Sequence, residues 1–310
     1  MRGKTEVVGI GLMNMDYIFW IQEDVSSHRF AISEYLIRPG GAAANTVSCL
    51  ARLGIRSGFI GAVGDDDEGE KLIESFRCVG VDINHIRVIK GARTGASLCL
   101  VHQDGSREMM LLPGANRYLD ASDTDMTYLT TVRAIHLGSL QSTRLQYSRI
   151  CVLPSDIKFT FAPKLHSWAA IFEALANIQR PVSIFINIAD AKIAPKGWRM
   201  KRTALALTKA GCETATVLRH RLGGPCGNDD LELCFVTSKN SIVQKRLDLK
   251  ISDPIGATDA FAAGYIYGSL NGHSEEECAD LGVRFAIYCL SHTGIRGYLP
   301  SIRRLLRVQA

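Results

Sequence analysis

The chain has 310 residues, enough for one large α/β domain or two smaller ones, and its 46% hydrophobic and 22% charged residues are ordinary for a globular protein. The net charge of +5, from 36 basic and 31 acidic residues without a long basic run, gives no support to nucleic-acid binding. No apolar run reaches the roughly 18 residues of a membrane helix, and no signal peptide is evident, so we expect no membrane partner and cytoplasmic residence.

The cysteines bear on the redox compartment. There are nine of them, an odd number, and no two are spaced C-x-x-C. Several lie inside apolar runs, as Cys99 and Cys289 do. This pattern predicts buried free thiols in a reducing compartment rather than a disulfide framework or a zinc site.

Short strands and helices alternate along most of the chain. The ranges 7–12, 57–64, 133–138 and 183–187 predict strands, and 68–77 predicts an amphipathic helix. Such alternation predicts an α/β fold with a mostly parallel, doubly wound sheet flanked by helices.

Two early segments depart from this alternation. Residues 15–39 contain apolar runs without a convincing helix, and residues 94–112 predict a hairpin around the turn pair Asp104-Gly105. Inserted early in an α/β domain, these segments predict a small separate sheet. One face of that sheet would need to be covered by a ligand or by a second subunit.

The strongest chemical signal is D-P-I-G-A-T-D at residues 253–259. Pro254 disfavours a helix at the preceding residue, so we expect a buried helix to begin near Gly256. Gly256, Ala257 and Thr258 then lie at a helix N-terminus. Their backbone N–H groups and the positive end of the helix dipole suit an anion such as a transferring phosphoryl group.

Asp259 lies in the first turn of the same helix. Its carboxylate can cap the helix. It can instead accept a proton from an alcohol held beside a phosphate, which makes it a candidate general base for phosphoryl transfer. Spacing alone leaves both interpretations open.

A second motif, R-P-G-G-A-A-A-N, occupies residues 38–45. Gly40 and Gly41 permit a close backbone turn, and Asn45 is a candidate N-cap for a short helix that Gly54 ends. The alternative is that the two glycines let a hydroxylated ligand approach the backbone while Asn45 forms a hydrogen bond to it.

Together these motifs resemble the two signature regions of the ribokinase family of carbohydrate kinases, the PfkB family. Their order and separation also agree, and the resemblance covers nearly the whole chain from Val7 to about Ser301. It implies a single ribokinase-like domain over residues 1–310, with a mostly parallel central sheet flanked by helices. A small β-sheet lid, from about residues 13–39 and 92–113, would be inserted in this α/β core.

The resemblance also implies the residues that bind the acceptor. N-M-D at 14–16 is similar to the family's substrate-binding aspartate region, so Asn14 and Asp16 would bind ligand hydroxyls. Gly40, Gly41 and Asn45 would complete this site.

On the nucleotide side, N-I-A-D at 187–190 resembles the family's N-x-x-E motif. Asn187 would help to bind the phosphates, and Asp190, in place of the usual glutamate, would hold magnesium through water. G-P-C-G at 224–227 resembles the segment that approaches the nucleotide, with Gly224 and Gly227 as contacts. Asp253 and the carbonyl of Ile255 match the positions that hold a monovalent cation such as potassium in some members.

Departures from the family pattern cluster on the ATP side. Thr258 replaces the second glycine of the usual G-A-G-D, and a β-branched residue there would be strained if the position required a positive φ. Ala43 stands where many members have glycine. The segments 162–164 and 218–222 lack the usual aspartate and hydroxyl residue, respectively.

The resemblance therefore implies an ATP-dependent kinase that uses magnesium and phosphorylates a primary hydroxyl of a sugar, with Asp259 as the general base. A nucleoside kinase of the same family is an alternative, since its motifs are similar. A non-catalytic sugar- or nucleoside-binding relative is another, although retention of Asp259 argues against it. A nicotinamide-dependent oxidoreductase is the weakest, because residues 9–14 miss the last glycine of G-x-G-x-x-G. By analogy with the family, we expect a homodimer formed through the lid.

Overall fold

The fold is that of a computed structural model. It describes residues 4–24, 29–102, 107–119, 126–138, 152–163, 168–188, 200–221, 229–239, 241–253, 255–292 and 302–305.

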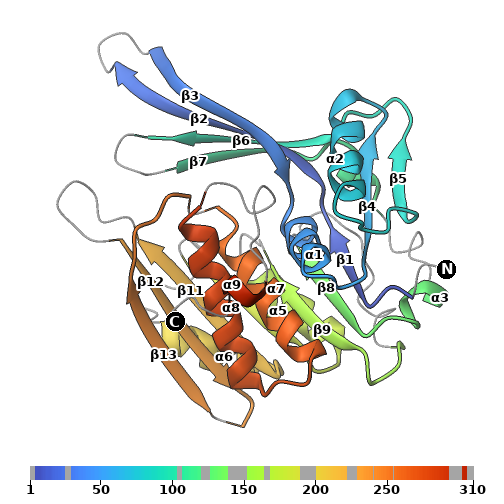
Figure 1. The fold of residues 1–310 in the computed structure, drawn as a ribbon, viewed down its shortest axis with the longest axis vertical. Coiled ribbons are helices and arrows are strands. Elements are labelled where there is room, and N and C mark those ends of the chain that lie inside the picture. Colours follow the sequence, from blue (N-terminus) through green and yellow to red (C-terminus); the bar gives the residue numbers. More distant parts are fainter. Residues whose placement is uncertain are drawn as a thin grey trace.

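A large sheet forms the centre of the molecule (Figure 1). In spatial order its strands are β13 (Ile242–Asp248), β12 (Asp230–Thr237), β11 (Thr214–Arg221), β10 (Ser183–Asn187), β9 (Lys158–Ala162), β8 (Ala134–Gly138), β1 (Val7–Gly11), β4 (Ser57–Gly64) and β5 (Ile86–Ile89). From β5 to β11 each strand is parallel to the next, whereas β12 is antiparallel to both β11 and β13. A mostly parallel sheet was predicted and is confirmed.

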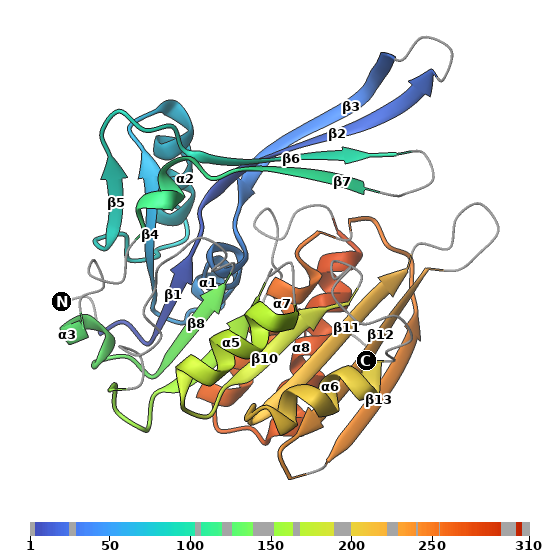
Figure 2. The same ribbon diagram turned by 180° about the vertical axis from the view of Figure 1, so that it is seen from behind.

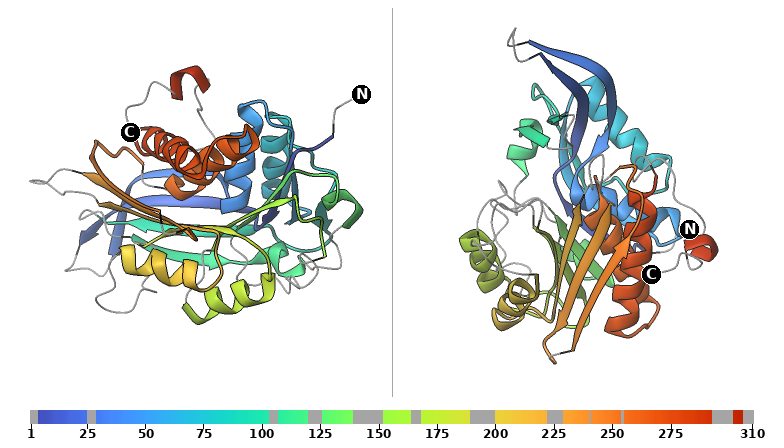
Figure 3. Two further views of the ribbon diagram at one scale, coloured as in Figure 1. Left: turned by 90° about the horizontal axis from the view of Figure 1, so that it is seen from below. Right: turned by 90° about the vertical axis from the view of Figure 1, so that its left-hand side faces the viewer.

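Helices cover both faces of this sheet. Seen from below and from behind, α1 (Ala42–Arg52), α7 (Ala257–Leu270) and α8 (Glu275–Leu290) lie on one face, and α5 (Trp168–Ile178) and α6 (Met200–Lys209) lie on the other (Figures 2 and 3). The shorter or peripheral elements are α2 (Asp67–Arg77), the 3₁₀ helix η1 (Gly114–Tyr118), α3 (Met126–Leu129) and α9 (Ile302–Leu305).

Strand periodicity explains how α7 is fixed to the sheet. On β10, Ile184 and Ile186 belong to the core cluster under α5 and α6, whereas Phe185 points to the opposite face. There its ring centroid lies 5.4 Å from that of Phe261 on α7, in an edge-on arrangement. This apolar packing holds the start of α7 near the carboxyl ends of the parallel strands.

The small sheet is separate. Its spatial order is β3 (Arg29–Gly40), β2 (Asn14–Asp24), β6 (Gly95–Val101) and β7 (Arg107–Leu112), and it projects beyond the large sheet (Figures 1 and 2). The two strands of the predicted hairpin are confirmed as the antiparallel pair β6 and β7. The predicted turn at Asp104-Gly105 lies outside the described residues. The fold class, including a small additional sheet, is therefore as predicted.

Two further expectations can be compared with the structure. Within the described residues the cysteines are free thiols, and all but Cys78 are buried, as predicted. Over the same residues, no helix is both long and apolar enough to cross a membrane.

Candidate active site

The first turn of α7 has the geometry of an anion-binding helix start. Gly256 is the N-cap residue, with φ 92° and ψ 2°, and no side chain caps the helix. A left-handed backbone of this kind favours glycine. The N–H groups of Ala257 and Thr258 belong to the first turn, where a helix provides no carbonyl partners. Together with the helix dipole, they suit a phosphate oxygen.

Thr258 itself is helical, so the expected strain at this position does not arise. The positive φ of the loop falls on Gly256, and among the described non-glycine residues only Gln179 has one. A β-branched residue is therefore tolerated in place of the family's second glycine.

Asp259 is buried, with 2% of its surface exposed. Its Oδ2 atom accepts a hydrogen bond of 2.8 Å from Nδ2 of Asn45, which is 214 positions away in the sequence. Its backbone carbonyl accepts one of 3.2 Å from Oγ1 of Thr46. The N-cap of α7 is Gly256, which has no side chain, and the bond at Oδ2 of Asp259 goes to a residue of another helix, α1.

The prediction that Asn45 caps α1 is also wrong. The N-cap of α1 is Gly41, with φ 103°, and the N–H of Asn45 already donates to the carbonyl of Gly41 at 2.8 Å within the helix. A Cβ on Gly41 would lie 2.2 Å from the carbonyl oxygen of Leu12, so only glycine fits there. The amide of Asn45 is thereby available to reach Asp259. Gly54, with φ 89°, follows the end of α1 as predicted.

Asp16 lies on β2 of the small sheet. Its Oδ1 atom accepts a hydrogen bond of 2.6 Å from Oγ of Ser97 on the adjacent strand β6. A Cβ on Gly40 would lie 2.1 Å from Oδ2 of Asp16. Gly40 is therefore required because the carboxylate occupies the space of a side chain.

Asn14 is held by a residue that the sequence analysis missed. Nδ2 of Asn116, on η1, donates to Oδ1 of Asn14 at 2.8 Å, and the same side chain pairs with both backbone groups of Met13. Asn116 is fully buried. Ser97 was missed as well, although its position on β6, opposite Asp16 in the register, would follow once the hairpin is paired with β2.

The oxygens predicted to hold a monovalent cation already have donors from the chain. Asp253 accepts the N–H of Ile255 at Oδ1, at 2.9 Å, and faces a guanidinium nitrogen of Arg38 at Oδ2, at 2.5 Å. The carbonyl of Ile255 accepts a weak bond from the thiol of Cys289, with sulfur and oxygen 3.6 Å apart. These residues therefore do not fit a cation site.

The nucleotide side is described only in part. Asn187 ends β10, and its Nδ2 atom lies 3.4 Å from Nδ1 of His220 on β11. Asp190, Gly224 and Gly227 lie outside the described residues. Within the part of the chain that is described, no group of three or more metal-ligating side chains occurs.

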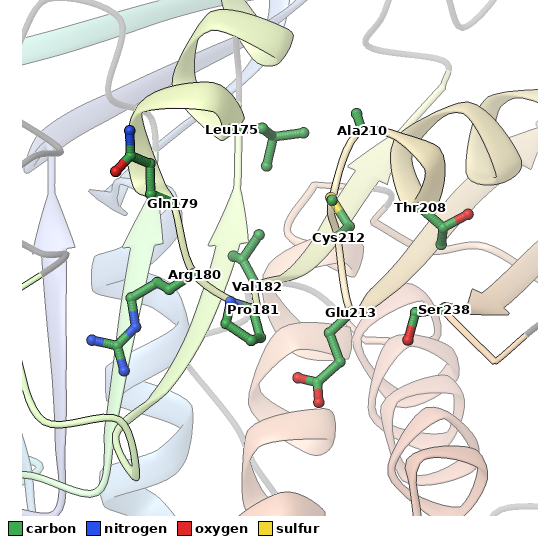
Figure 4. Close-up of a pocket in the computed structure, with 11 residues that line it drawn as sticks. Leu175, Gln179, Arg180, Pro181, Val182, Thr208, Ala210, Cys212, Glu213 and Ser238 are labelled. Atoms are coloured by element: carbon green, nitrogen blue, oxygen red, sulfur yellow. The ribbon is translucent and has the colours of Figure 1, made fainter.

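A pocket of about 500 Å³ lies elsewhere (Figure 4). Its lining includes Val182 and Glu213, which directly precede β10 and β11, so it opens at the amino ends of these strands. Ligands of open α/β sheets bind at the carboxyl ends. None of the predicted site residues lines this pocket.

Comparison with known proteins gives a consistent result. A model of the family described as pfkB family carbohydrate kinase matches residues 4–152 and 233–302. A sugar kinase of Archaeoglobus fulgidus, named as uncharacterized, is 28% identical over 258 residues, which cover 81% of this chain and 98% of its own. An aminoimidazole riboside kinase of Salmonella typhimurium is 40% identical over 249 residues, covering 76% of this chain and 75% of its own.

Solved structures share the fold. The ribokinase of Arabidopsis thaliana, complexed with ribose and ATP, superposes with a TM-score of 0.75 at 17% identity, covering 99% of both chains. A putative ribokinase II of E. coli, in complex with ATP and Mg²⁺, superposes with a TM-score of 0.74 at 17% identity, covering 97% of this chain and 98% of its own. At this level of identity the likeness shows a common fold.

Proposed function

We propose that this chain, which belongs to the pfkB family of carbohydrate kinases and is an ATP-dependent sugar or nucleoside kinase, uses Asp259 as the general base toward a hydroxyl of a sugar. The observation that carries this proposal is the bond between Asn45 and Asp259. It joins the two sequence motifs at one point, directly beside the N–H groups that begin α7.

The hydrogen bond between Asn45 and Asp259 supports a role for Asp259 as a general base rather than as a helix cap. A hydrogen bond from a neutral amide fixes the orientation of the carboxylate without neutralising its charge. Burial of Asp259 removes water that would otherwise compete for an acceptor hydroxyl. A carboxylate so placed can take the proton as the hydroxyl oxygen bonds to phosphorus.

The acceptor would lie between the small sheet and α7. Ser97 and Asn116 fix the side chains of Asp16 and Asn14, so a polyhydroxylated ligand would meet polar groups whose positions are already set. Gly40 leaves room for the carboxylate of Asp16 itself, which could not take this position beside a residue with a side chain. The small sheet would thereby act as the lid of the acceptor site.

In the proposed reaction, ATP supplies the phosphoryl group, and Asp190 would hold a magnesium ion, which would supply positive charge to offset that of the phosphates. The hydroxyl proton passes to Asp259 while the oxygen–phosphorus bond forms and ADP leaves. The N–H groups of Gly256, Ala257 and Thr258 stabilise the negative charge on the transferring group. Asn187, Gly224 and Gly227 would contact the nucleotide.

A riboside is the second candidate acceptor. The relative from Salmonella typhimurium is named for an aminoimidazole riboside, and its similarity covers 76% of this chain. Asp16 and Asn45 would face the ribose of such a molecule as they would face a free sugar.

We also retain the homodimer as a proposal, because Tyr35 and Met109 expose apolar surface on the small sheet.

An acceptor panel tests this function. We would follow ADP release and product mass with ribose, fructose, 2-keto-3-deoxygluconate, adenosine, cytidine, inosine and aminoimidazole riboside, with and without magnesium. We expect magnesium-dependent transfer to a sugar from this set. Tight binding of a panel member without any phosphorylated product would instead support a non-catalytic relative.

A further inference from the structure

Arg38 connects the small sheet to the loop before α7. It lies near the end of β3, and its guanidinium reaches Asp253, 215 positions later in the sequence. The nitrogen and oxygen are 2.5 Å apart, and the two side chains are only 12% and 10% exposed. A partly buried charge pair of this geometry depends on both partners, because removal of one leaves the other charged without compensation.

Neutral groups of the chain form further hydrogen bonds to the oxygens of Asp253 and Ile255. The N–H of Ile255 donates to Asp253, and the thiol of Cys289 donates to the carbonyl of Ile255. Burial raises the pKa of Cys289 well above its ordinary value, so the thiol keeps its proton and remains a donor. The carboxylate of Asp253 and the carbonyl of Ile255, the two groups predicted to coordinate a cation, are thus engaged by groups of the chain itself.

We propose that Arg38 is a built-in replacement for a monovalent cation, a positioning residue that fixes the loop from Asp253 to Gly256 and makes the enzyme independent of potassium. The guanidinium supplies the positive charge that Asp253 requires, and it is delivered by the chain rather than drawn from solvent. Its planar donors also fix direction, which a spherical ion does not do. A potassium ion at the same carboxylate would be repelled by the guanidinium.

Arg38 is connected along the chain to both parts of the proposed active site. Asp253 orients Ile255, the next residue is the N-cap Gly256, and the N–H groups of the first turn of α7 follow. β3 also leads directly into Gly40 and the start of α1, which carries Asn45. Arg38 therefore fixes the position of the proposed acceptor site relative to the proposed phosphate site at the start of α7. The expected effect on the reaction rate rests on the proposed function.

The first test uses the wild-type protein and needs no substrate. We would measure its melting temperature in potassium chloride and in choline chloride at equal ionic strength. An ion that binds the folded state raises the melting temperature with concentration. We expect no difference between the two salts, and a potassium-dependent rise would overturn the proposal.

The second test removes the guanidinium. Arg38→Ala vacates the carboxylate, so its melting temperature should rise with potassium but not with choline. Its turnover in choline should fall on the order of 10²-fold, as expected when a reacting group is displaced, and potassium or guanidinium chloride should restore part of the loss. Arg38→Lys should stay folded with its charge in place and show no potassium dependence.

Arg246→Ala is the matched control, because it removes an arginine from Asp230, another nearly buried carboxylate, on the strands β12 and β13. It should show no potassium effect. Unchanged turnover of Arg38→Ala in choline would refute the positioning role. If the wild type phosphorylates no acceptor, the proposed function fails, yet the melting experiments still decide whether Arg38 replaces a cation.

Discussion

Asp253 and Asp259 are both buried carboxylates at the start of α7, but the structure gives them different partners. Asp253 faces the guanidinium of Arg38, whereas Asp259 accepts from the neutral amide of Asn45. A guanidinium compensates the charge of a carboxylate, whereas a neutral amide orients the carboxylate and leaves its charge in place. The difference assigns Asp253 to holding the loop and leaves Asp259 able to accept a proton.

Asp16 extends the comparison to the acceptor side, since the partner at its Oδ1 is the neutral hydroxyl of Ser97. Asp16→Ala should weaken acceptor binding by about 10- to 150-fold, because hydrogen bonds to a charged group contribute roughly 1.5–3 kcal/mol. Calorimetry should find ATP affinity unchanged. Ser97→Ala is the control and should cost less. Unaltered acceptor affinity in Asp16→Ala would mean that the acceptor lies elsewhere.

Asn45→Asp would replace the neutral partner of Asp259 by a second carboxylate, and so tests whether that neutrality matters. Two carboxylates in hydrogen-bond contact do not readily both ionise, so the pair would retain one shared proton. Asp259 would then stay protonated, and inactive as a base, up to a higher pH than in the wild type. We expect the acid limb of the pH–rate profile to move upward by more than about one unit. Asn45→Ala adds no charge and should leave that limb near its wild-type position.

Gly256→Ala tests the loop that separates the two carboxylates. A left-handed backbone costs a residue with a Cβ about 1–2 kcal/mol, so the free energy of unfolding should fall by that amount. Gly272, after the end of α7, has φ 81° with open space around it, and Gly272→Ala should cost a similar amount. Only the first substitution should reduce turnover. Equal turnover in both variants would argue against an anion site at Gly256.

His136 is a buried titratable group away from this chemistry, on β8, where its Nδ1 atom lies 2.8 Å from Oγ1 of Thr160. Burial lowers its pKa from 6.5 to about 3. As the pH falls, His136 therefore takes up a proton in the unfolded chain before it does so in the folded protein. The contribution of His136 to the free energy of unfolding is fully present above pH 6.5 and is lost as the pH falls toward 3. The loss is at most about 1.4 kcal/mol per pH unit. Denaturation of His136→Asn at pH 7 and 5 should show a shallower dependence than the wild type.

The sequence predicted the fold class, the parallel strands and the helix that begins near Gly256, because these depend on local periodicity and backbone preference. The assignment of Asn45 as the N-cap of α1 was wrong, and local spacing left the role of Asp259 open, for one reason. Each side chain found its partner 214 positions away, and local spacing contains no information about such a contact. The site residues themselves remain predictions.

Arg38 and Asn116 illustrate the same limit. Arg38 lies inside the motif R-P-G-G-A-A-A-N, but the motif alone gives it no role, because its importance depends on Asp253, which only the folded chain brings near. Asn116 follows a glycine turn, a pattern shared by many residues without function. Thr258 shows the reverse case, where a departure from the family pattern suggested strain that the helical backbone does not contain.

The most direct test of the central claim is the turnover of Asp259→Asn beside its melting curve. The amide has nearly the same shape and can still accept from Asn45, so the fold and both ligand sites should persist. It cannot take the hydroxyl proton, and loss of a general base typically costs about 10²–10⁴-fold, so we expect a fall of that order in the rate constant. A folded Asp259→Asn variant that keeps more than about a tenth of wild-type turnover would contradict the assignment of Asp259 as the base.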